Sequence, residues 1–409
     1  MSRATQQPRT TERDGGFDEI TQAMTTPEFR QNPYPLYARM RREHPVHRGA
    51  QGIWYVTRYA DVDAALHDRR LSNDRERTAC AFATRNEGLS RLMRRLGRVI
   101  SNTDPPDHTR LRHLVTKAFT GRRVQGLHPR IQAIADEFLD TAIAAGPTMD
   151  LIAALASPLP TTVISEWFGI PQHDRKRVTA WFHQLTNPTD GLDGVELTME
   201  HLEDYLADLI HSRRAEPVDD VISALITARE RGDRLTDEEL LATSLVLLTA
   251  GDATTTNLIG NGTLALLRHP DQLRRLRRDP TLIRSAVNEL MRYDTPTQIL
   301  IRVVAEATEI GGQALDDGDL VYLVLAATNR DLDRFDDPDQ LDLARPDNRH
   351  LSFGAGPRFC LGAPLSRLQA EIAIGKLVQR LPALRLDTET LEWLPNPMQR
   401  GLACLPLAY

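Results

Sequence analysis

Apolar residues recur at intervals of three and four along most of the chain, which is the spacing of amphipathic helices. The pattern is continuous from about residue 106 to residue 290, where proline or glycine marks the breaks between helical segments. Two shorter helices are predicted over 35–42 and 59–68. Between them, the runs 46–48 and 53–56 flank a glycine-containing turn, which is typical of a β-hairpin. The chain is therefore predicted to be mainly α-helical with small β-sheets, an α+β fold class.

The longest predicted helix begins at a capping box formed by Thr236 and Glu239 and continues to about Arg268. At 1.5 Å per residue it would be about 50 Å long and would cross the whole molecule. Gly251 and the threonines at 254–256 weaken its middle, by about 2 to 3 kcal/mol of helix propensity relative to alanine. Threonine hydroxyls that bond back to carbonyls and bend the helix are one explanation of this composition, and a functional site is the other.

Composition limits the domain organisation and the partners. No Gly/Ser linker, low-complexity tract or fixed-period repeat divides the 409 residues, so we expect one large domain over 17–409 after a polar, disordered tail at 1–16. Lys and Arg total 50 against 56 Asp and Glu, and the net charge of −6 argues against nucleic acid as a partner. Neither a signal peptide nor the roughly 20 apolar residues of a membrane span is found, so a cytoplasmic protein without membrane contact is predicted.

Of the cysteines, Cys80, Cys360 and Cys404, only Cys360 lies in a context that favours chemistry. It follows a glycine-punctuated loop and precedes a helix with apolar residues on one face, in the sequence FGAGPRFCLG at 353–362. Helix N-terminal amides would lower the pKa of this thiol and stabilise the thiolate that binds metals. The alternatives are a small buried apolar residue and a dinucleotide-binding loop, although the loop lacks the third glycine of the dinucleotide fingerprint.

The segment FGAGPRFCLG resembles the haem-binding signature of the cytochrome P-450 superfamily, FGxGx(H/R)xCxG, and fills every fixed position. The resemblance implies the P-450 fold, in which haem b lies between the long central helix and the loop–helix that carries the cysteine. It implies that Cys360 is the axial thiolate ligand of the iron and that Arg358 meets a haem propionate. Phe353 and Gly354 of the same loop are predicted haem contacts. A thiolate ligand favours O–O cleavage at the iron.

Further segments match the family in the same order along the chain. Glu289 and Arg292 resemble its ExxR motif, and with Arg345 they are expected to form a Glu-Arg-Arg cluster that supports the haem loop. This role is structural. Residues 104–112 resemble the family's helix across the proximal haem face. The resemblance implies further contacts to the propionates from His108, Arg112, Arg302 and His350.

Residues 250–255, AGDATT, resemble the family's distal-helix motif AGx(D/E)TT, in which an acid and an alcohol supply protons at the haem. Ala250 begins the motif beside the haem, and Thr254 falls on the alcohol position. Ala253 occupies the acid position, and Asp252 is one residue early, rotated by about 100° around the helix. Three outcomes stay open: Asp252 acts through a bulged helix or a water, solvent supplies protons without it, or the reaction needs fewer protons.

The resemblance implies a monooxygenase that activates O2 with two external electrons and hydroxylates or epoxidises an apolar natural product of bacterial secondary metabolism. Three cysteines cannot ligate both a haem and a four-cysteine iron–sulfur cluster, so a separate ferredoxin and ferredoxin reductase are expected. A basic stretch at 110–123 would dock the ferredoxin. Substrate contacts are expected in 73–98, 165–202, 297–300 and 397–399. The alternatives are another haem-thiolate outcome, such as aryl coupling, desaturation or peroxide-driven oxidation, and a non-catalytic haem ligand binder.

Overall fold

The computed structural model describes residues 23–24, 26–49, 51–79, 99–186, 191–229 and 232–409. The predicted tail at 1–16 lies outside these residues. The α-helices are α2 (Pro27–Gln31), α3 (Tyr34–Glu43), α4 (Tyr59–His67), α7 (Asp107–Ala118), α8 (Gly121–Gly126), α9 (His128–Ala145), α10 (Pro158–Trp167), α11 (Arg175–Thr186), α12 (Gly191–Ala215), α13 (Val221–Thr227), α14 (Asp237–Ala250), α15 (Asp252–Arg268), α16 (Pro270–Arg278), α17 (Ile283–Tyr293), α18 (Leu325–Thr328) and α19 (Ala363–Arg380).

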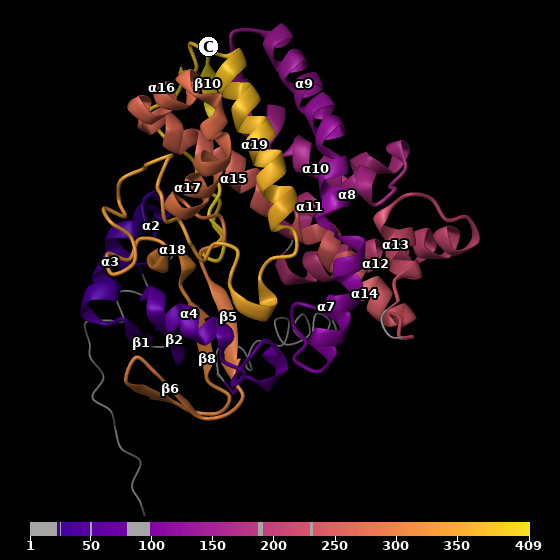
Figure 1. Cartoon of the computed structure of the whole chain (residues 1–409), viewed down its shortest axis with the longest axis vertical. Helices are drawn as coiled ribbons and strands as arrows, with labels where there is room; N and C mark the ends of the chain where they lie inside the picture. Colours follow the sequence, from indigo (N-terminus) through magenta and orange to yellow (C-terminus); the bar gives the residue numbers. More distant parts are fainter. Residues whose placement is uncertain (1–22, 25, 50, 80–98, 187–190, 230–231) are drawn as a thin grey trace, which may run out of the picture.

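Helices form most of the molecule, and α15 runs through its middle beside α17 and α19 (Figure 1). The largest apolar cluster joins these helices to α7, α9, α10 and α12. A π-helix, η2 (Ile152–Ala156), packs against α15 and leads into α10. None of the described helices combines the length and the apolar sequence that a membrane span requires. The predicted mainly α-helical class with small β-sheets is confirmed.

A mixed five-stranded sheet lies at the side of the helical body, in the order β1-β2-β8-β5-β3 (Figure 1). The predicted hairpin forms its edge, because β1 and β2 are antiparallel and Gly52 turns between them with φ 79°. Only β2 and β8 pair in parallel. The strands are β1 (Val46–Arg48), β2 (Ile53–Val56), β3 (Leu71–Ser72), β5 (Leu300–Val304) and β8 (Leu320–Leu323).

Both faces of this sheet are buried, and alternate residues of β2 point to opposite sides. Ile53 and Tyr55 join the apolar cluster that includes α3, whereas Trp54 and Val56 join the cluster that includes α4. The other strands form two small sheets, with the order β4-β10-β9 and the hairpin β6-β7. Their bounds are β4 (Thr148–Asp150), β6 (Thr308–Ile310), β7 (Gln313–Leu315), β9 (Arg385–Leu386) and β10 (Pro406–Ala408).

The prediction of one continuous helix over 236–268 is wrong, because the structure divides this segment at Gly251 into α14 and α15. The capping box at its start is confirmed, with Thr236 and Glu239 exchanging their bonds. The break falls where the propensity is lowest. Thr254 Oγ1 donates to the carbonyl of Ala250 across the break at 3.0 Å, which is the back-bonding alternative considered for these threonines.

Candidate functional site

A cavity of about 390 Å³ lies between the α14–α15 junction, β5 and the loop before α19. The structure brings together here most of the site residues predicted from the sequence, and apolar side chains complete the walls. The predicted residues that line the cavity are Ala250, Thr254, Arg302, Phe353, Gly354, Arg358 and Cys360. The predicted residues that do not line it are His108, Arg112, Asp252 and His350.

The loop that carries Cys360 is held by its own backbone. The amide of Cys360 donates to the carbonyl of Phe353 at 2.9 Å, so the loop closes on itself just before α19. Gly354 and Gly356 have φ values of 69° and 66°, which side-chain-bearing residues rarely adopt. A Cβ on Gly356 would also lie 2.8 Å from the His67 ring. The loop therefore needs its glycines to present the thiol to the cavity.

The pKa of the Cys360 thiol differs from the one expected from the sequence. Burial raises its pKa, and this outweighs the lowering effects of the Gly362 and Ala363 amides and of the Arg112 and Arg367 guanidinium groups. The predicted lowering of this pKa is therefore wrong for the protein alone, because the helix N-terminus does not compensate for the loss of solvation. The same amides and cations still favour a negative charge on the sulfur.

Two guanidinium groups, those of the buried Arg302 and the half-buried Arg358, line the cavity near Cys360. Arg302 is only 5% exposed and donates to the carbonyl of Ile301 at 2.8 Å. Burial, together with the charges of Arg358 and Arg75, lowers its pKa to about 10. Arg358 bonds Asp104 at 2.8 Å, whereas its Nη1 is buried and has no partner. Asp104 is thus the carboxylate that faces both guanidinium groups, and the cations at this end of the cavity are only partly neutralised.

His108 and Arg112, on α7, lie beside this cationic end but outside the cavity lining. His108 is buried, and burial and then the charges of Arg358 and Arg112 lower its pKa to about 4. Arg112 Nη2 donates to the carbonyl of Phe359 at 2.5 Å. Arg112 thus connects α7 to the loop that carries Cys360, and the contacts of His108 and Arg112 with the propionates stay a prediction.

Hydrogen bonds to other protein groups hold His350 in position, and its side chain does not line the cavity. Its Nε2 lies 3.0 Å from Asn288 Oδ1, and its Nδ1 accepts from the amide of Ser352 at 3.2 Å. These bonds require the proton to be on Nε2. Burial, followed by the charges of Arg367 and Arg292, lowers its pKa to about 3. The structure therefore gives His350 a role in joining α17 to the loop before Cys360.

The Glu-Arg-Arg cluster expected behind the loop is present. Arg292 forms two bonds of 2.7 Å with Glu289, and both side chains are fully buried. Arg345 reaches the same carboxylate at 3.2 Å. The remaining nitrogen of Arg292, Nη1, donates to the carbonyls of Asn329 and Pro338 at 2.8 Å. A buried ion pair with these additional bonds fixes the backbone on which the Cys360 loop rests.

Asp252 points away from the Cys360 cavity. Its carboxylate accepts a hydrogen bond from Thr161 of α10, and the residue is only 6% exposed. It lines a different cavity, on the reverse side of α15, together with Ala253. The displacement by one residue that was noted in the sequence thus moves the acid to another face of the helix, and the Thr161 contact was not expected.

Sequence reasoning also missed Ser366 and Gln369, which reach the cavity from α19. Thr255 Oγ1 donates to Ser366 Oγ at 3.0 Å, and the buried Gln369 Oε1 has no protein partner. Two polar residues three positions apart on the apolar side of a helix were the available signal. Of the expected substrate contacts, Thr297 and Leu300 line the cavity, and residues 80–98 and 187–190 lie outside the described residues.

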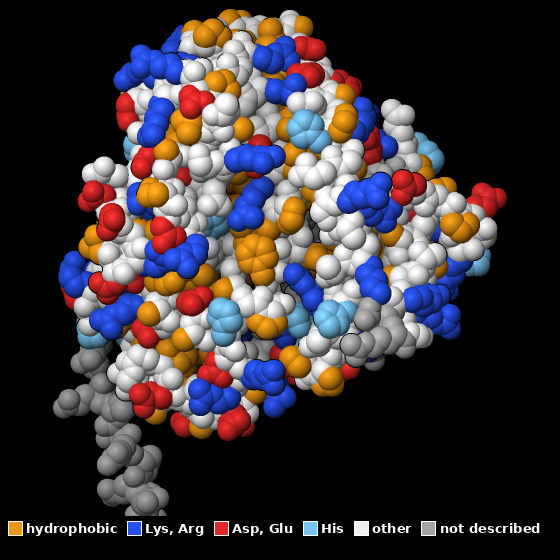
Figure 2. Space-filling model, viewed as in Figure 1, with side chains coloured by type: hydrophobic (Ala, Val, Ile, Leu, Met, Phe, Trp, Pro, Cys, Tyr) orange, Lys and Arg blue, Asp and Glu red, His pale blue; other side chains and the backbone are white. Residues whose placement is uncertain are grey.

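The basic stretch at 110–123 is partly neutralised. Arg110 pairs with Asp233 and Glu239, and Arg123 pairs with Asp219. Figure 2 shows Lys and Arg side chains, with several His, on the side of the molecule where α7 and α8 lie. The surface there remains predominantly basic.

Comparisons with known proteins agree with this arrangement. The family model described as Cytochrome P450 matches residues 162–406, more than half of the chain. Cytochrome P450 107B1 of Saccharopolyspora erythraea is 44% identical over 93% of this chain and 95% of its own. Cytochrome P450 monooxygenase PikC of Streptomyces venezuelae is 42% identical over 93% and 92%. Among solved structures, the bacillaene polyketide synthase cytochrome P450 PksS of Bacillus subtilis has a TM-score of 0.87 and 37% identity, covering 94% of this chain and 98% of that one.

The chain therefore belongs to the cytochrome P450 family. It is a monooxygenase, and the family's cofactor is a haem with a thiolate ligand. The residues of the cavity fit such a group. A thiol lies on the cavity wall, and Arg302 and the unpaired Nη1 of Arg358 provide buried positive charge that carboxylates would complete.

Proposed function

We propose that this monooxygenase binds haem b in the Cys360 cavity, with Cys360 as the axial ligand, and oxidises an apolar natural product by hydroxylation or epoxidation. The observation that carries the proposal is the position of Cys360 on the wall of one cavity with Thr254, Arg302 and Arg358. When bound, thiolate-ligated haem iron supplies the activation of O2 and the insertion of one oxygen atom into the substrate.

The residues around the cavity have distinct tasks in this proposal. Arg302 and Arg358 bind the propionates, with His108 and Arg112 beside them, because buried carboxylates need cationic partners. Phe353 and Gly354 form the cavity wall on the side of Cys360, and Ala250 leaves space on the opposite helix. The Thr254 hydroxyl donates and accepts hydrogen bonds on the α15 side, while His350 and the Glu289 cluster position the loop.

The proposed substrate follows from the cavity walls. Leu66, Phe119, Ile164, Leu247 and Leu300 line the cavity, which favours a largely apolar molecule. The names of two relatives, "Polyketide biosynthesis cytochrome P450 PksS" and "6-deoxyerythronolide B hydroxylase", support the same class of substrate. We therefore favour a polyketide-like or terpenoid-like compound.

The electrons are proposed to come from a separate ferredoxin and its reductase. The exposed His113 and Arg122 lie on the basic side of α7 and α8, where an acidic partner would dock. Reduction rates should fall with increasing salt, and Arg122→Glu should lower them further. Rates that are independent of ionic strength would contradict docking at this surface.

The test of the proposed function is turnover with a surrogate ferredoxin system and a panel of apolar compounds preselected by the shift that they cause in the haem spectrum. A product heavier than the substrate by one oxygen atom is expected, with label from 18O2. Loss of two hydrogens without oxygen would favour desaturation instead. Binding without any turnover would favour the non-catalytic alternative.

A further inference from the structure

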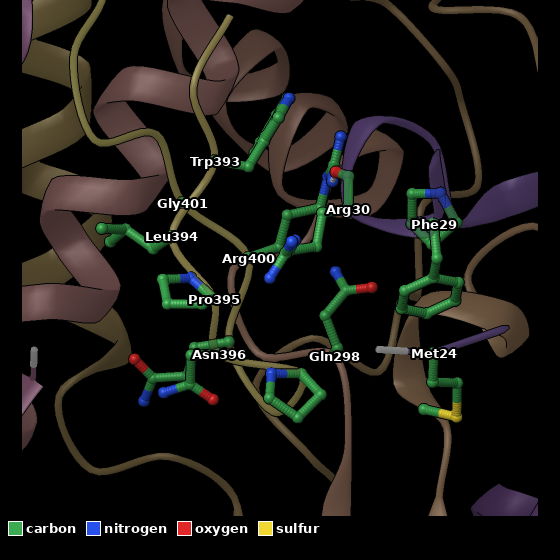
Figure 3. A pocket seen from close by; sticks show the side chains of 13 residues that line it. Met24, Phe29, Arg30, Gln298, Trp393, Leu394, Pro395, Asn396, Arg400 and Gly401 are labelled. Atoms are coloured by element: carbon green, nitrogen blue, oxygen red, sulfur yellow. Dashed lines mark hydrogen bonds between the residues drawn. The ribbon is translucent and has the colours of Figure 1, made fainter. Parts of the chain in front are cut away.

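An outer pocket of about 140 Å³ lies between α2 and the segment 393–401, and no described residue lines both this pocket and the Cys360 cavity. Figure 3 shows it between Phe29 and Met24 on one side and the 393–396 segment on the other. Residues 397 and 399, which were expected from the sequence to contact substrate, line the outer pocket instead. The outer pocket is therefore separate from the site described above.

Hydrogen bonds between distant parts of the chain fix the walls of the outer pocket. The guanidinium of Arg400, a residue only 8% exposed, bonds the carboxylate of Asp294 at 2.9 Å. It also donates to the carbonyls of Arg30 and Gln31 in α2, and it lies 3.4 Å from the centroid of the Trp393 ring. Trp393 Nε1 donates to Gln31 Oε1 at 3.2 Å. Because the protein itself satisfies these polar groups, the pocket is formed before any ligand binds.

The size and the apolar walls of the outer pocket favour a single ring. Met24, Phe29 and Trp393 are buried and line it, together with the prolines at 33, 395 and 397. An apolar protein cavity of about 150 Å³ binds benzene, and the outer pocket has nearly this volume. A molecule with two fused rings would be too large to enter it completely.

The polar residues of the outer pocket favour a negative charge on this ring. Arg30 and Arg400 line it, and no acidic residue is found among the described residues of its walls. Asp294 neutralises Arg400, whereas the half-buried Arg30 forms no ion pair within the described part of the chain. The Gln399 amide is a further hydrogen-bonding group of the wall. A carboxylate next to the ring would pair with the free guanidinium.

A short backbone ladder separates the outer pocket from the Cys360 cavity. Pro296 and Thr297 line the Cys360 cavity, whereas Gln399 and Arg400 line the outer pocket. Thr297 pairs with Gln399 in an antiparallel bridge, and the amide of Arg400 donates to the carbonyl of Pro296 at 2.7 Å. Each pair joins a wall of one cavity to a wall of the other. A ligand that displaces one wall therefore also displaces the other.

We propose that the outer pocket is a second ligand site for a small carboxylate with a single ring, and that its occupation changes ligand affinity in the Cys360 cavity. The ring packs against Phe29 and Trp393, and the carboxylate pairs with Arg30. The ladder of residues 296–297 and 399–400 links the two cavities. The ligand site is independent of the proposed function, whereas the link rests on it, because the link requires haem in the Cys360 cavity.

Calorimetric titration of the holoenzyme with benzoate tests the ligand site, with imidazole bound to the iron so that the Cys360 cavity is occupied. Benzoate should bind more tightly than benzyl alcohol, which lacks the charge, and than acetate, which lacks the ring. It should also bind more tightly than 2-naphthoate, which is too large. Arg30→Gln should weaken benzoate binding by about tenfold, as expected for a lost bond between charged groups.

Arg268→Gln is the matched control for Arg30→Gln. Arg268 lies in the last turn of α15, as Arg30 lies in the last turn of α2, but it is exposed and lines neither cavity. This variant should bind benzoate like the wild type. Acetate or 2-naphthoate binding as tight as that of benzoate, or an unchanged benzoate affinity in Arg30→Gln, would overturn the ligand site.

The link is tested by measuring imidazole binding from the haem spectrum with and without benzoate. Benzoate should change the imidazole affinity by about fivefold or more, and imidazole should change the benzoate affinity by the same factor, because such a linkage is reciprocal. In Arg30→Gln, about ten times more benzoate should be needed for this effect. An imidazole affinity that ignores benzoate would overturn the link, and so would an effect that Arg30→Gln leaves unchanged. If the protein bound no haem, the proposed function would fail, and the benzoate titration would still test the outer pocket.

Discussion

The two sides of the Cys360 cavity differ in how closely they follow the family pattern. On the loop side, backbone bonds and the Glu289 cluster determine where each group lies. On the α15 side, Gly251 breaks the helix and the acid faces another cavity. The loop side must present a single sulfur atom, so its geometry is fixed by the backbone. The α15 side presents Thr254 to the cavity, while Asp252 lies on another face of the same helix.

The largest loss of stability should follow Glu289→Gln, which breaks the support of the loop side. Removing this carboxylate leaves Arg292 and Arg345 buried without their counter-charge, a change that costs about 3–5 kcal/mol of unfolding free energy. Urea unfolding of the holoenzyme measures it. Glu43→Gln, in the exposed pair with Arg39, is the control and should leave the midpoint unchanged. Similar unfolding midpoints for both variants would contradict the role of Glu289 in supporting the Cys360 loop.

Arg302→Met should separate haem binding from protein stability. The variant loses a propionate partner, so haem affinity should fall by about tenfold to a hundredfold, as expected for a lost bond to a charged group. The protein without haem should be no less stable, because a buried cation repelled by Arg358 is removed. Haem titration and unfolding of the apoprotein measure the two effects. An unchanged affinity would place the propionates elsewhere.

His350 should make the loop side sensitive to acid. Its folded-state pKa of about 3 lies below the ordinary 6.5, so the unfolded chain binds more protons and stability falls as pH falls below 6.5. Between pH 6.5 and pH 5 this group alone should cost about 2 kcal/mol. His350→Gln should therefore show a shallower decline over this range. Parallel stability curves for both proteins would mean that His350 is not buried in its neutral form.

The smallest change in stability, with a clear change in chemistry, is expected for Thr254→Ala on the α15 side. The variant loses one hydrogen bond to the Ala250 carbonyl but gains helix propensity, so its unfolding free energy should change by less than about 1 kcal/mol. Peroxide released per reductant consumed should rise. Unchanged coupling would remove Thr254 from proton supply.

The loop side could be predicted from the sequence because its function depends on backbone geometry that few sequences satisfy. The glycines at 354 and 356, Cys360 and the Glu289–Arg292 pair all lie where the resemblance to the family implied. The α15 side could be predicted only in part. The sequence indicated a weak point at Gly251 and a displaced acid, but the hydrogen bond from Thr161 to Asp252 forms only through the tertiary fold.

The pKa of Cys360 also could not be predicted from the sequence. A helix N-terminus is visible in the sequence, whereas the burial that raises the pKa depends on the whole fold. The same holds for His350, whose partner Asn288 lies 62 positions away along the chain. Local motifs identified these residues, and long-range packing determined their state.

The central claim is that the Cys360 sulfur ligates the haem iron, and the carbonyl spectrum of the reduced, haem-loaded protein tests it most directly. The wild type should give the spectrum of a thiolate-ligated haem, and Cys360→Ser should lose it while Cys404→Ser keeps it. A wild-type spectrum of the imidazole-ligated type, or a thiolate spectrum that survives Cys360→Ser, would contradict the account.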